Sequence, residues 1–175
     1  IFFQKYSQMS RSQQGLAGAG EWETLRKLLP DFKDKHVLDL GCGYGWHCIY
    51  AMEHGASSVV GVDISHKMLE VAKEKTHFPQ VEYKCCAIED VEFPEESFDV
   101  ILSSLAFHYV ADYEILVKKI YRILKSGGKL VFTVEHPVFT AYGTQDWYYN
   151  EKGEILHFPV DNYYYEGKRT AVFLG

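Results

Sequence analysis

The chain has 175 residues, of which 47% are hydrophobic, and it carries a formal net charge of −6 with a sequence pI of about 5.7. This length is enough for one domain with a hydrophobic core, and no apolar run reaches the ~18 residues that a membrane-spanning helix needs. The acidic balance argues against nucleic acid as the main partner, because binding to phosphates needs a basic face.

Strand and helix patterns alternate five times along the chain. After a polar segment over residues 1–16, apolar residues at helical spacing predict an amphipathic helix over residues 17–29, which Pro30 ends. Strands are expected at residues 36–40, 58–62, 81–87, 98–102 and 129–134, and further helices at residues 45–54, 65–75 and 113–124. Because the strands are continuous apolar runs, we predict a doubly wound α/β fold, with a mostly parallel sheet covered by helices on both faces.

The four cysteines are Cys42, Cys48, Cys85 and Cys86. None of them forms a C-x-x-C pair, the spacing that is typical of zinc sites. No acidic cluster indicates a catalytic metal either. We therefore predict no metal site, and we expect reduced, buried cysteines in a cytoplasmic protein.

The stretch "VLDLGCGYGWH" (residues 37–47) places three glycines directly after the first expected strand. In a doubly wound sheet, ligands bind beyond the carboxyl ends of the strands. Glycines at that place adopt positive φ and let a ligand lie against the bare backbone. The helix that follows points its N-terminus at the same place. A ligand with a negative or electron-rich end is therefore expected over Gly41 to Gly45.

Two acidic residues narrow the class of ligand. Asp63 follows Gly41 by 22 positions and ends the second expected strand, where a carboxylate can accept hydrogen bonds from both ribose hydroxyls. The third glycine comes one residue earlier than in a dinucleotide G-x-G-x-x-G motif, and Asp39 is a poor neighbour for a pyrophosphate. The pattern favours a nucleoside that carries an amine. The alternatives are that Asp63 caps a helix and that Asp39 is purely structural.

Residues 37–45 resemble the first motif of the class I S-adenosylmethionine-dependent methyltransferases, and Asp63 matches the acid that binds the ribose in that family. Three later stretches match further landmarks of the family: "CAIEDV" (86–91), "FDVILSSLAFHYV" (98–110) and "ILKSGGKLVF" (123–132). The likeness covers roughly residues 36–135 and is to the small-molecule branch, which is methyltransferase type 11-like. It implies a Rossmann-like fold and S-adenosylmethionine as the methyl donor.

The resemblance also implies a set of residues that bind S-adenosylmethionine. They are Asp39, Gly41, Cys42, Gly43, Gly45, Asp63, Ile64, Met68, Ala87, Ile88, Glu89 and Ser103. In the family's arrangement the glycine turn would hold the methionine tail, and Asp39 would lie near the ammonium group. Residues 64, 68 and 87–89 would surround the adenine, and Ser103 would lie under the sulfonium.

Candidates for the acceptor side are less tightly defined by the pattern. His108 and Tyr109 follow the fourth strand and are candidate catalytic residues, which would act as a base or contact the substrate. The alternative is that one of them packs in the structure and the other is solvated. Transfer from a sulfonium needs mainly alignment, so the chemistry does not require a base. Tyr6 and Arg11 belong to a polar arm that can fold over the ligand, where Arg11 can hold a carboxylate.

The aromatic C-terminal region is the other candidate for the acceptor side. His136, Trp147 and Tyr148 form either an aromatic substrate pocket or a hydrophobic cover. We expect three parts: an arm and helix over residues 1–35 acting as a lid, a cofactor-binding core over 36–137, and an aromatic cover over 138–175. The family's sheet normally continues through further edge strands, so we expect the chain to be an incomplete stretch of a longer protein.

Several absences favour a small-molecule acceptor. After the fourth strand there is no Asn/Asp-Pro-Pro-aromatic stretch, which adenine methylation would require, and no cysteine for attack on cytosine. Oxygen, nitrogen, sulfur and carbon acceptors stay open, as does the oligomeric state. Two other functions also stay open, a module that binds the cofactor without transfer and a nicotinamide-dependent oxidoreductase.

Overall fold

The computed structural model of the chain describes residues 2–141 and 144–170. It contains two compact units that meet in sequence between Val134 and Glu135. The first unit comprises Phe3–Val134, so the N-terminal arm from Phe3 onward belongs to the same unit as the sheet, and the second comprises the residues from Glu135 onward together with Phe2. Over the described residues, the structure has no helix both long and apolar enough to cross a bilayer.

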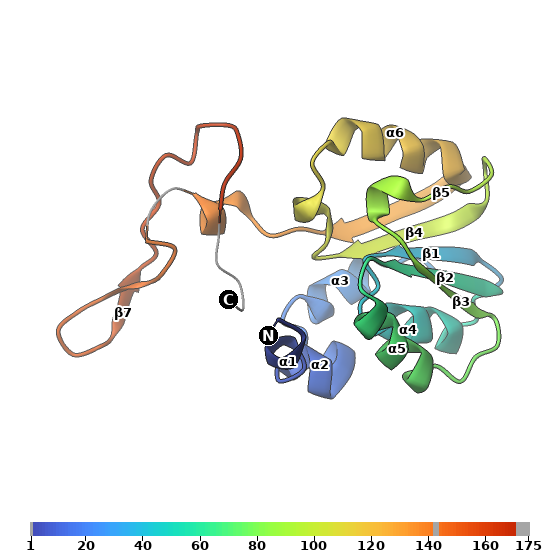
Figure 1. Cartoon of the computed structure of the whole chain (residues 1–175), viewed down its shortest axis with the longest axis horizontal. Helices are drawn as coiled ribbons and strands as arrows, with labels where there is room; N and C mark the ends of the chain where they lie inside the picture. The colour runs from blue at the N-terminus through green and yellow to red at the C-terminus, as the bar shows by residue number, and fades with distance from the viewer. Residues whose placement is uncertain (1, 142–143, 171–175) are drawn as a thin grey trace. The chain divides into compact units, whose positions relative to one another are not determined.

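A five-stranded parallel sheet forms the centre of the first unit (Figure 1). Its strands are β1 (His36–Leu40), β2 (Ser58–Asp63), β3 (Val81–Cys85), β4 (Phe98–Ser104) and β5 (Leu124–Thr133), in the order β3-β2-β1-β4-β5. The prediction of a doubly wound parallel sheet is confirmed. The chain runs outward from β1 to β3 and then returns to β4, so the switch point of the sheet lies between β1 and β4.

Helices cover both faces of the sheet because neighbouring side chains of each buried strand point to opposite faces. Figure 1 shows α6 (Tyr113–Ile123) on one face, and α3 (Trp22–Leu28), α4 (Trp46–Glu53) and α5 (His66–Lys75) on the other. In β1, Val37 packs with Cys48 and Ala51 of α4, whereas the next residue, Leu38, packs with Leu116 of α6. The two faces therefore have separate hydrophobic cores.

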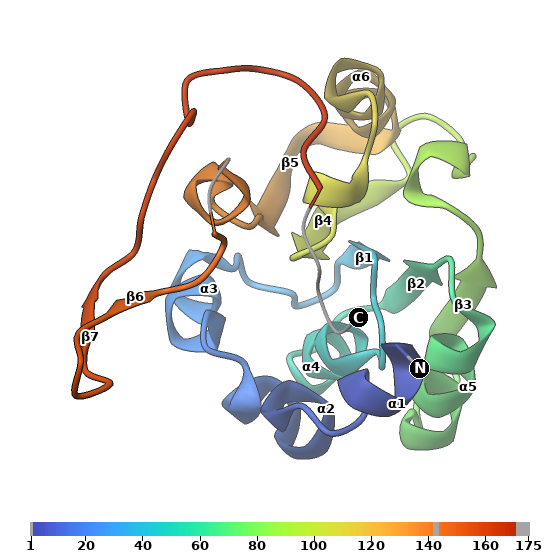
Figure 2. The ribbon, with the colours of Figure 1, turned by 60° about the vertical axis from the view of Figure 1, so that its left-hand side comes forward.

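The N-terminal arm consists of α1 (Phe2–Tyr6), α2 (Ser10–Gln14) and the 3-10 helix η1 (Gly15–Gly18), which lie beside α4 (Figure 2). The helix expected over residues 17–29 is shorter, because α3 begins only at Trp22. Gly18 belongs to η1, and a Cβ atom there would lie 2.3 Å from the carbonyl oxygen of Ser10. This close approach of two backbone segments replaces the expected first turn of the helix.

Two other expectations differ from the structure. The fifth strand, expected over residues 129–134, already begins at Leu124, so Gly127 and Gly128 lie within β5, whose register with β4 shifts between Phe98 and Val100. The prediction of buried cysteines is wrong for Cys85, which is exposed, and only partly right for Cys86, which is half-buried. Both lie where β3 ends at the rim of the sheet. Cys42 and Cys48 are buried, and all four thiols are free.

The second unit contains the 3-10 helix η4 (Pro137–Thr140) and an antiparallel hairpin of β6 (Tyr148–Tyr149) and β7 (Ile155–His157). The side-chain oxygen of Asn150 accepts hydrogen bonds from the backbone N–H groups of Lys152 and Glu154, which fixes the turn between the two strands. Arg169 donates to three carbonyl oxygens, those of Pro137, Tyr163 and Tyr165. This guanidinium therefore holds the irregular segments of the unit together.

Candidate functional site

The glycine turn after β1 lies at the carboxyl end of the sheet, and its glycines have left-handed φ angles. At Gly41, with φ of 81°, an added Cβ would lie 2.4 Å from the Cβ of Ala106, so the turn packs directly on the segment after β4. At Gly43, with φ of 53°, the nearest atom to an added Cβ is the hydroxyl of Tyr6 at 3.7 Å. Gly43 is therefore the place where the backbone is open to a ligand.

Backbone N–H groups of this turn donate within the protein. Gly41 and Cys42 both donate to the carbonyl oxygen of Val62, at 2.8 and 2.9 Å, and Gly45 donates to that of Cys42 at 2.9 Å. A pyrophosphate or another anion would need such donors. The N–H groups of Gly41, Cys42 and Gly45 are therefore already engaged within the protein, and a negative or electron-rich end of a ligand over this turn stays a prediction.

Asp63 is the group that joins the turn to the end of β2. One carboxylate oxygen accepts from the N–H of Gly43 at 2.9 Å, and the other accepts from the N–H of Ser65 at 2.8 Å. Burial raises the pKa of Asp63, and these two hydrogen bonds oppose the rise. Each carboxylate oxygen has a further lone pair. The two oxygens can therefore also accept from the hydroxyls of a ribose.

Asp39 in β1 is a buried carboxylate with an incomplete set of partners. It is only 1% exposed. One oxygen accepts from the thiol of Cys48 at 3.5 Å, and the other has no hydrogen-bond partner among the described residues. Burial raises the pKa of Asp39 to about 7. A buried carboxylate of this kind is costly unless a donor or a cation reaches it, which fits a ligand with an ammonium group.

The raised pKa of Asp39 predicts a pH-dependent stability. Unfolded, this carboxyl ionises near pH 4, whereas in the folded chain it stays protonated until about pH 7. The folded state therefore binds the extra proton, and its stability falls as pH rises between these values, by up to about 1.4 kcal/mol per pH unit. We expect the free energy of unfolding, measured in urea at pH 5 and at pH 7, to change less with pH in Asp39→Asn than in the unmodified chain. An equal change in the two proteins would contradict this expectation.

The residues expected around an adenine are only partly brought together. Ile88 lies against the turn, with its Cδ1 3.6 Å from an added Cβ at Gly41, and Ile64 after β2 is 73% exposed. Ala87, which directly precedes the 3-10 helix η2 (Ile88–Asp90), is half-buried, and Glu89 within that helix is exposed. Met68 is instead buried on the inner side of α5. An adenine contact for these residues stays a prediction.

On the acceptor side, the candidates differ in exposure. The Ser103 hydroxyl is buried and donates to the carbonyl oxygen of Leu40 at 2.8 Å, so it ties β4 to β1. His108 and Tyr109 lie in the 3-10 helix η3 (Phe107–Tyr109), where both are exposed and their rings are 4.2 Å apart. These two side chains therefore lie at the surface beyond the end of β4, and their role in catalysis stays a prediction.

The arm brings Tyr6 and Arg11 to the same edge of the sheet. The ring of Tyr6 packs edge-on against that of Tyr44 in the glycine turn, with centroids 5.5 Å apart, and burial raises the pKa of Tyr6. Arg11 forms an ion pair with Glu21, and the same carboxylate oxygen accepts from the hydroxyl of Ser104 at 3.1 Å. Sequence reasoning did not find Glu21 or Ser104, because no local motif marks them.

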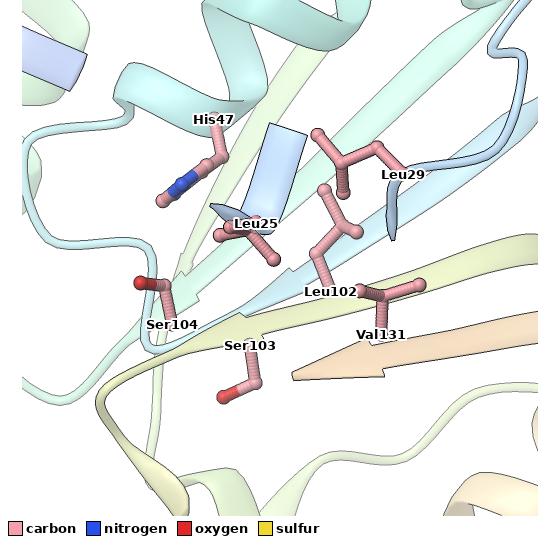
Figure 3. A pocket seen from close by; sticks show the side chains of 7 residues that line it. All are labelled: Leu25, Leu29, His47, Leu102, Ser103, Ser104 and Val131. Carbon is pink, nitrogen blue, oxygen red and sulfur yellow. The ribbon is translucent and has the colours of Figure 1, made fainter. Parts of the chain in front are cut away.

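A small pocket lies under α3 (Figure 3), and it encloses no space large enough for a water molecule. Its lining consists of Leu25, Leu29, His47, Leu102, Ser103, Ser104 and Val131. Figure 3 shows the side chain of Ser104 on the same side of β4 as His47, while that of Ser103 points the opposite way. Burial lowers the pKa of His47 to about 4, so the imidazole is neutral. Ligand sites enclose ~300 Å³ or more, so this pocket cannot hold a cofactor, and its lining does not include the glycine turn.

His136, Trp147 and Tyr148 belong to the second unit. His136 stacks on Tyr163 with centroids 6.1 Å apart, and Trp147 packs edge-on against Phe158 at 5.4 Å. Tyr148 is 55% exposed and stacks on His157 in the hairpin. These contacts are three separate aromatic pairs within that unit. The predicted role of the three residues in acceptor binding stays a prediction.

Comparison with known proteins extends the likeness beyond the turn. The profile of the methyltransferase domain family matches residues 38–132. A solved structure from Listeria monocytogenes, assigned as an S-adenosylmethionine-dependent methyltransferase, is 57% identical, has a TM-score of 0.83, and matches 89% of this chain and 73% of that one. A second S-adenosylmethionine-dependent methyltransferase, from Mesorhizobium loti, is 40% identical with a TM-score of 0.79, over 87% of this chain and 69% of that one.

The chain also matches part of a longer relative that is named for a biosynthetic pathway. The ubiquinone biosynthesis O-methyltransferase of Coxiella burnetii is 37% identical over 112 residues, which are 63% of this chain and 47% of that protein. The chain thus spans about half the length of this relative.

Proposed function

Because the chain belongs to the S-adenosylmethionine-dependent methyltransferases, we propose that it transfers a methyl group to a small-molecule acceptor by in-line attack on the methyl carbon. The observation that carries the proposal is the open backbone at Gly43 with the carboxylate of Asp63 beside it. The neighbouring N–H groups donate within the protein, so this place suits a nucleoside with a cationic tail better than a dinucleotide.

The residues around the turn fit S-adenosylmethionine, which supplies an electrophilic methyl group on a sulfonium when it is bound. Asp63 would hold the ribose hydroxyls, and the unpartnered oxygen of Asp39 makes it the candidate for the ammonium group. The backbone of Gly41, Cys42 and Gly43 would lie against the methionine tail. These roles account for two buried or half-buried carboxylates that otherwise raise the free energy of the fold.

The acceptor would approach from the carboxyl end of β4. His108 and Tyr109 are the exposed polar side chains after that strand, and Tyr6 covers the turn from the arm. Methyl transfer between aligned groups gains mainly from orientation and from exclusion of water. We therefore assign these residues first to alignment of the acceptor, and to proton removal only for acceptors that are protonated.

Calorimetry and turnover test this proposal. We expect the chain to bind S-adenosylmethionine and S-adenosylhomocysteine but not NAD, and to form S-adenosylhomocysteine with at least one member of a panel of small acceptors. Acceptors that carry a hydroxyl group come first in the panel because the Coxiella burnetii relative is an O-methyltransferase. Binding of NAD alone would favour an oxidoreductase. Binding of S-adenosylmethionine without turnover on any acceptor would favour a binding module.

A further inference from the structure

One carboxylate, that of Glu21, lies between three segments that are far apart in the sequence. Glu21 directly precedes α3. The same oxygen forms the ion pair with Arg11 of α2 and accepts from the hydroxyl of Ser104, the last residue of β4. The side chains of Arg11 and Glu21 are only 21% and 23% exposed. A charge-assisted pair in such partial burial holds its geometry better than an exposed pair does.

From Ser104 the contacts continue into the segment that carries the candidate acceptor residues. The hydroxyl of Thr133 donates to that of Ser104 at 3.3 Å. The N–H of Leu105 donates to the carbonyl oxygen of Thr133 at 2.9 Å and to its hydroxyl at 3.1 Å. Leu105 has φ of 53°, an unfavourable conformation for leucine that these contacts maintain. We call residues 104–110 the acceptor loop.

On the other side, the contacts lead to the cofactor turn. Arg11 belongs to the arm whose Tyr6 packs on Tyr44 and lies over Gly43. Burial alone would raise the pKa of Glu21, but hydrogen bonds and the charge of Arg11 lower it, so the carboxylate is ionised at neutral pH. The ion pair between Glu21 and Arg11 of the arm is therefore present at neutral pH.

We propose that Glu21 is a positioning residue for methyl transfer, which ties the arm over the cofactor turn to the acceptor loop so that the two are ordered together. This inference rests on the proposed function, because it assigns the arm to the cofactor and the loop to the acceptor. It predicts that a ligand bound at the turn stabilises the acceptor loop through Glu21 before any acceptor is present.

Hydrogen exchange with S-adenosylhomocysteine as the probe tests the coupling without knowledge of the acceptor. In the unmodified chain the probe should slow amide exchange in residues 3–18 and also in residues 104–110. In Glu21→Gln we expect the protection of residues 104–110 to disappear and the probe to dissociate roughly fivefold faster or more, the lower end of coupling between sites. Ser104→Ala should keep the protection of the arm and lose that of the loop.

Glu23→Gln is the matched control. Glu23 lies two residues further along and forms an exposed ion pair with Arg26, so the loss of its charge should leave both protections unchanged. If Glu21→Gln behaves like Glu23→Gln, the inference is wrong. If Glu21→Gln does not fold, Arg11→Met decides the question, because it should release the arm and uncouple the loop. No binding of the probe to the unmodified chain would instead contradict the proposed function.

Discussion

Asp63→Ala is expected to weaken the binding of S-adenosylhomocysteine by at least tenfold, and by on the order of a hundredfold if both ribose hydroxyls lose a charged acceptor. The structure adds a second reason for a large effect. The carboxylate also accepts from the N–H groups of Gly43 and Ser65, at 2.9 and 2.8 Å. Its removal leaves two donors without their partner and loosens the turn against which the ligand lies. Isothermal titration of the variant measures the sum of both effects.

A second ligand separates the two contributions to this loss. On the unmodified chain, the 2′-deoxy analogue of S-adenosylhomocysteine should bind more weakly than S-adenosylhomocysteine itself. On Asp63→Ala, the two ligands should bind about equally well. Asp99→Ala is the control, because Asp99 also accepts from a backbone N–H, that of His36 at 2.9 Å, but lies near the start of β4. The affinity of Asp99→Ala for S-adenosylhomocysteine should equal that of the unmodified chain. An unaltered affinity in Asp63→Ala would remove the ribose assignment.

The sheet could be predicted from the sequence because its signals are local. The central strands β1, β2 and β4 are short and largely apolar, and β1 begins and ends where expected, at residues 36–40. The next helix was expected over residues 65–75, and Ser65 caps it, since its hydroxyl accepts from the N–H of Met68 at 3.4 Å. Each of these features depends on residues within a few positions of each other, so the pattern alone carries the information.

The electrostatics of the site could not be predicted in the same way. The sequence shows glycines before a helix, which suggests free N–H groups for an anion. Whether those groups are free depends on the carbonyl oxygen of Val62 and the carboxylate of Asp63, which only the parallel pairing of β1 and β2 brings to the turn. Glu21 and Ser104 are likewise 83 positions apart. Contacts of this range leave no periodic trace in one sequence.

Gly43→Ala is expected to lower the affinity for S-adenosylhomocysteine more than tenfold, with only a small loss of stability. The added methyl group meets no other protein atom closer than the hydroxyl of Tyr6 at 3.7 Å, so it does not disturb the core. It stands on the one part of the turn where the backbone is open, and there it occupies space that the ligand needs. The left-handed φ of 53° adds a cost of about 1 kcal/mol for alanine.

Gly127→Ala separates this blockage from the cost of the backbone conformation. Gly127 has φ of 76° in β5 of the same unit, and an added Cβ there has no atom within 4 Å. Urea unfolding should therefore show a similar loss of about 1 kcal/mol for both variants, while titration shows weakened binding for Gly43→Ala alone. Equal affinities in the two variants would mean that no ligand lies against the backbone of Gly43. The cofactor would then have to bind elsewhere at the carboxyl edge of the sheet.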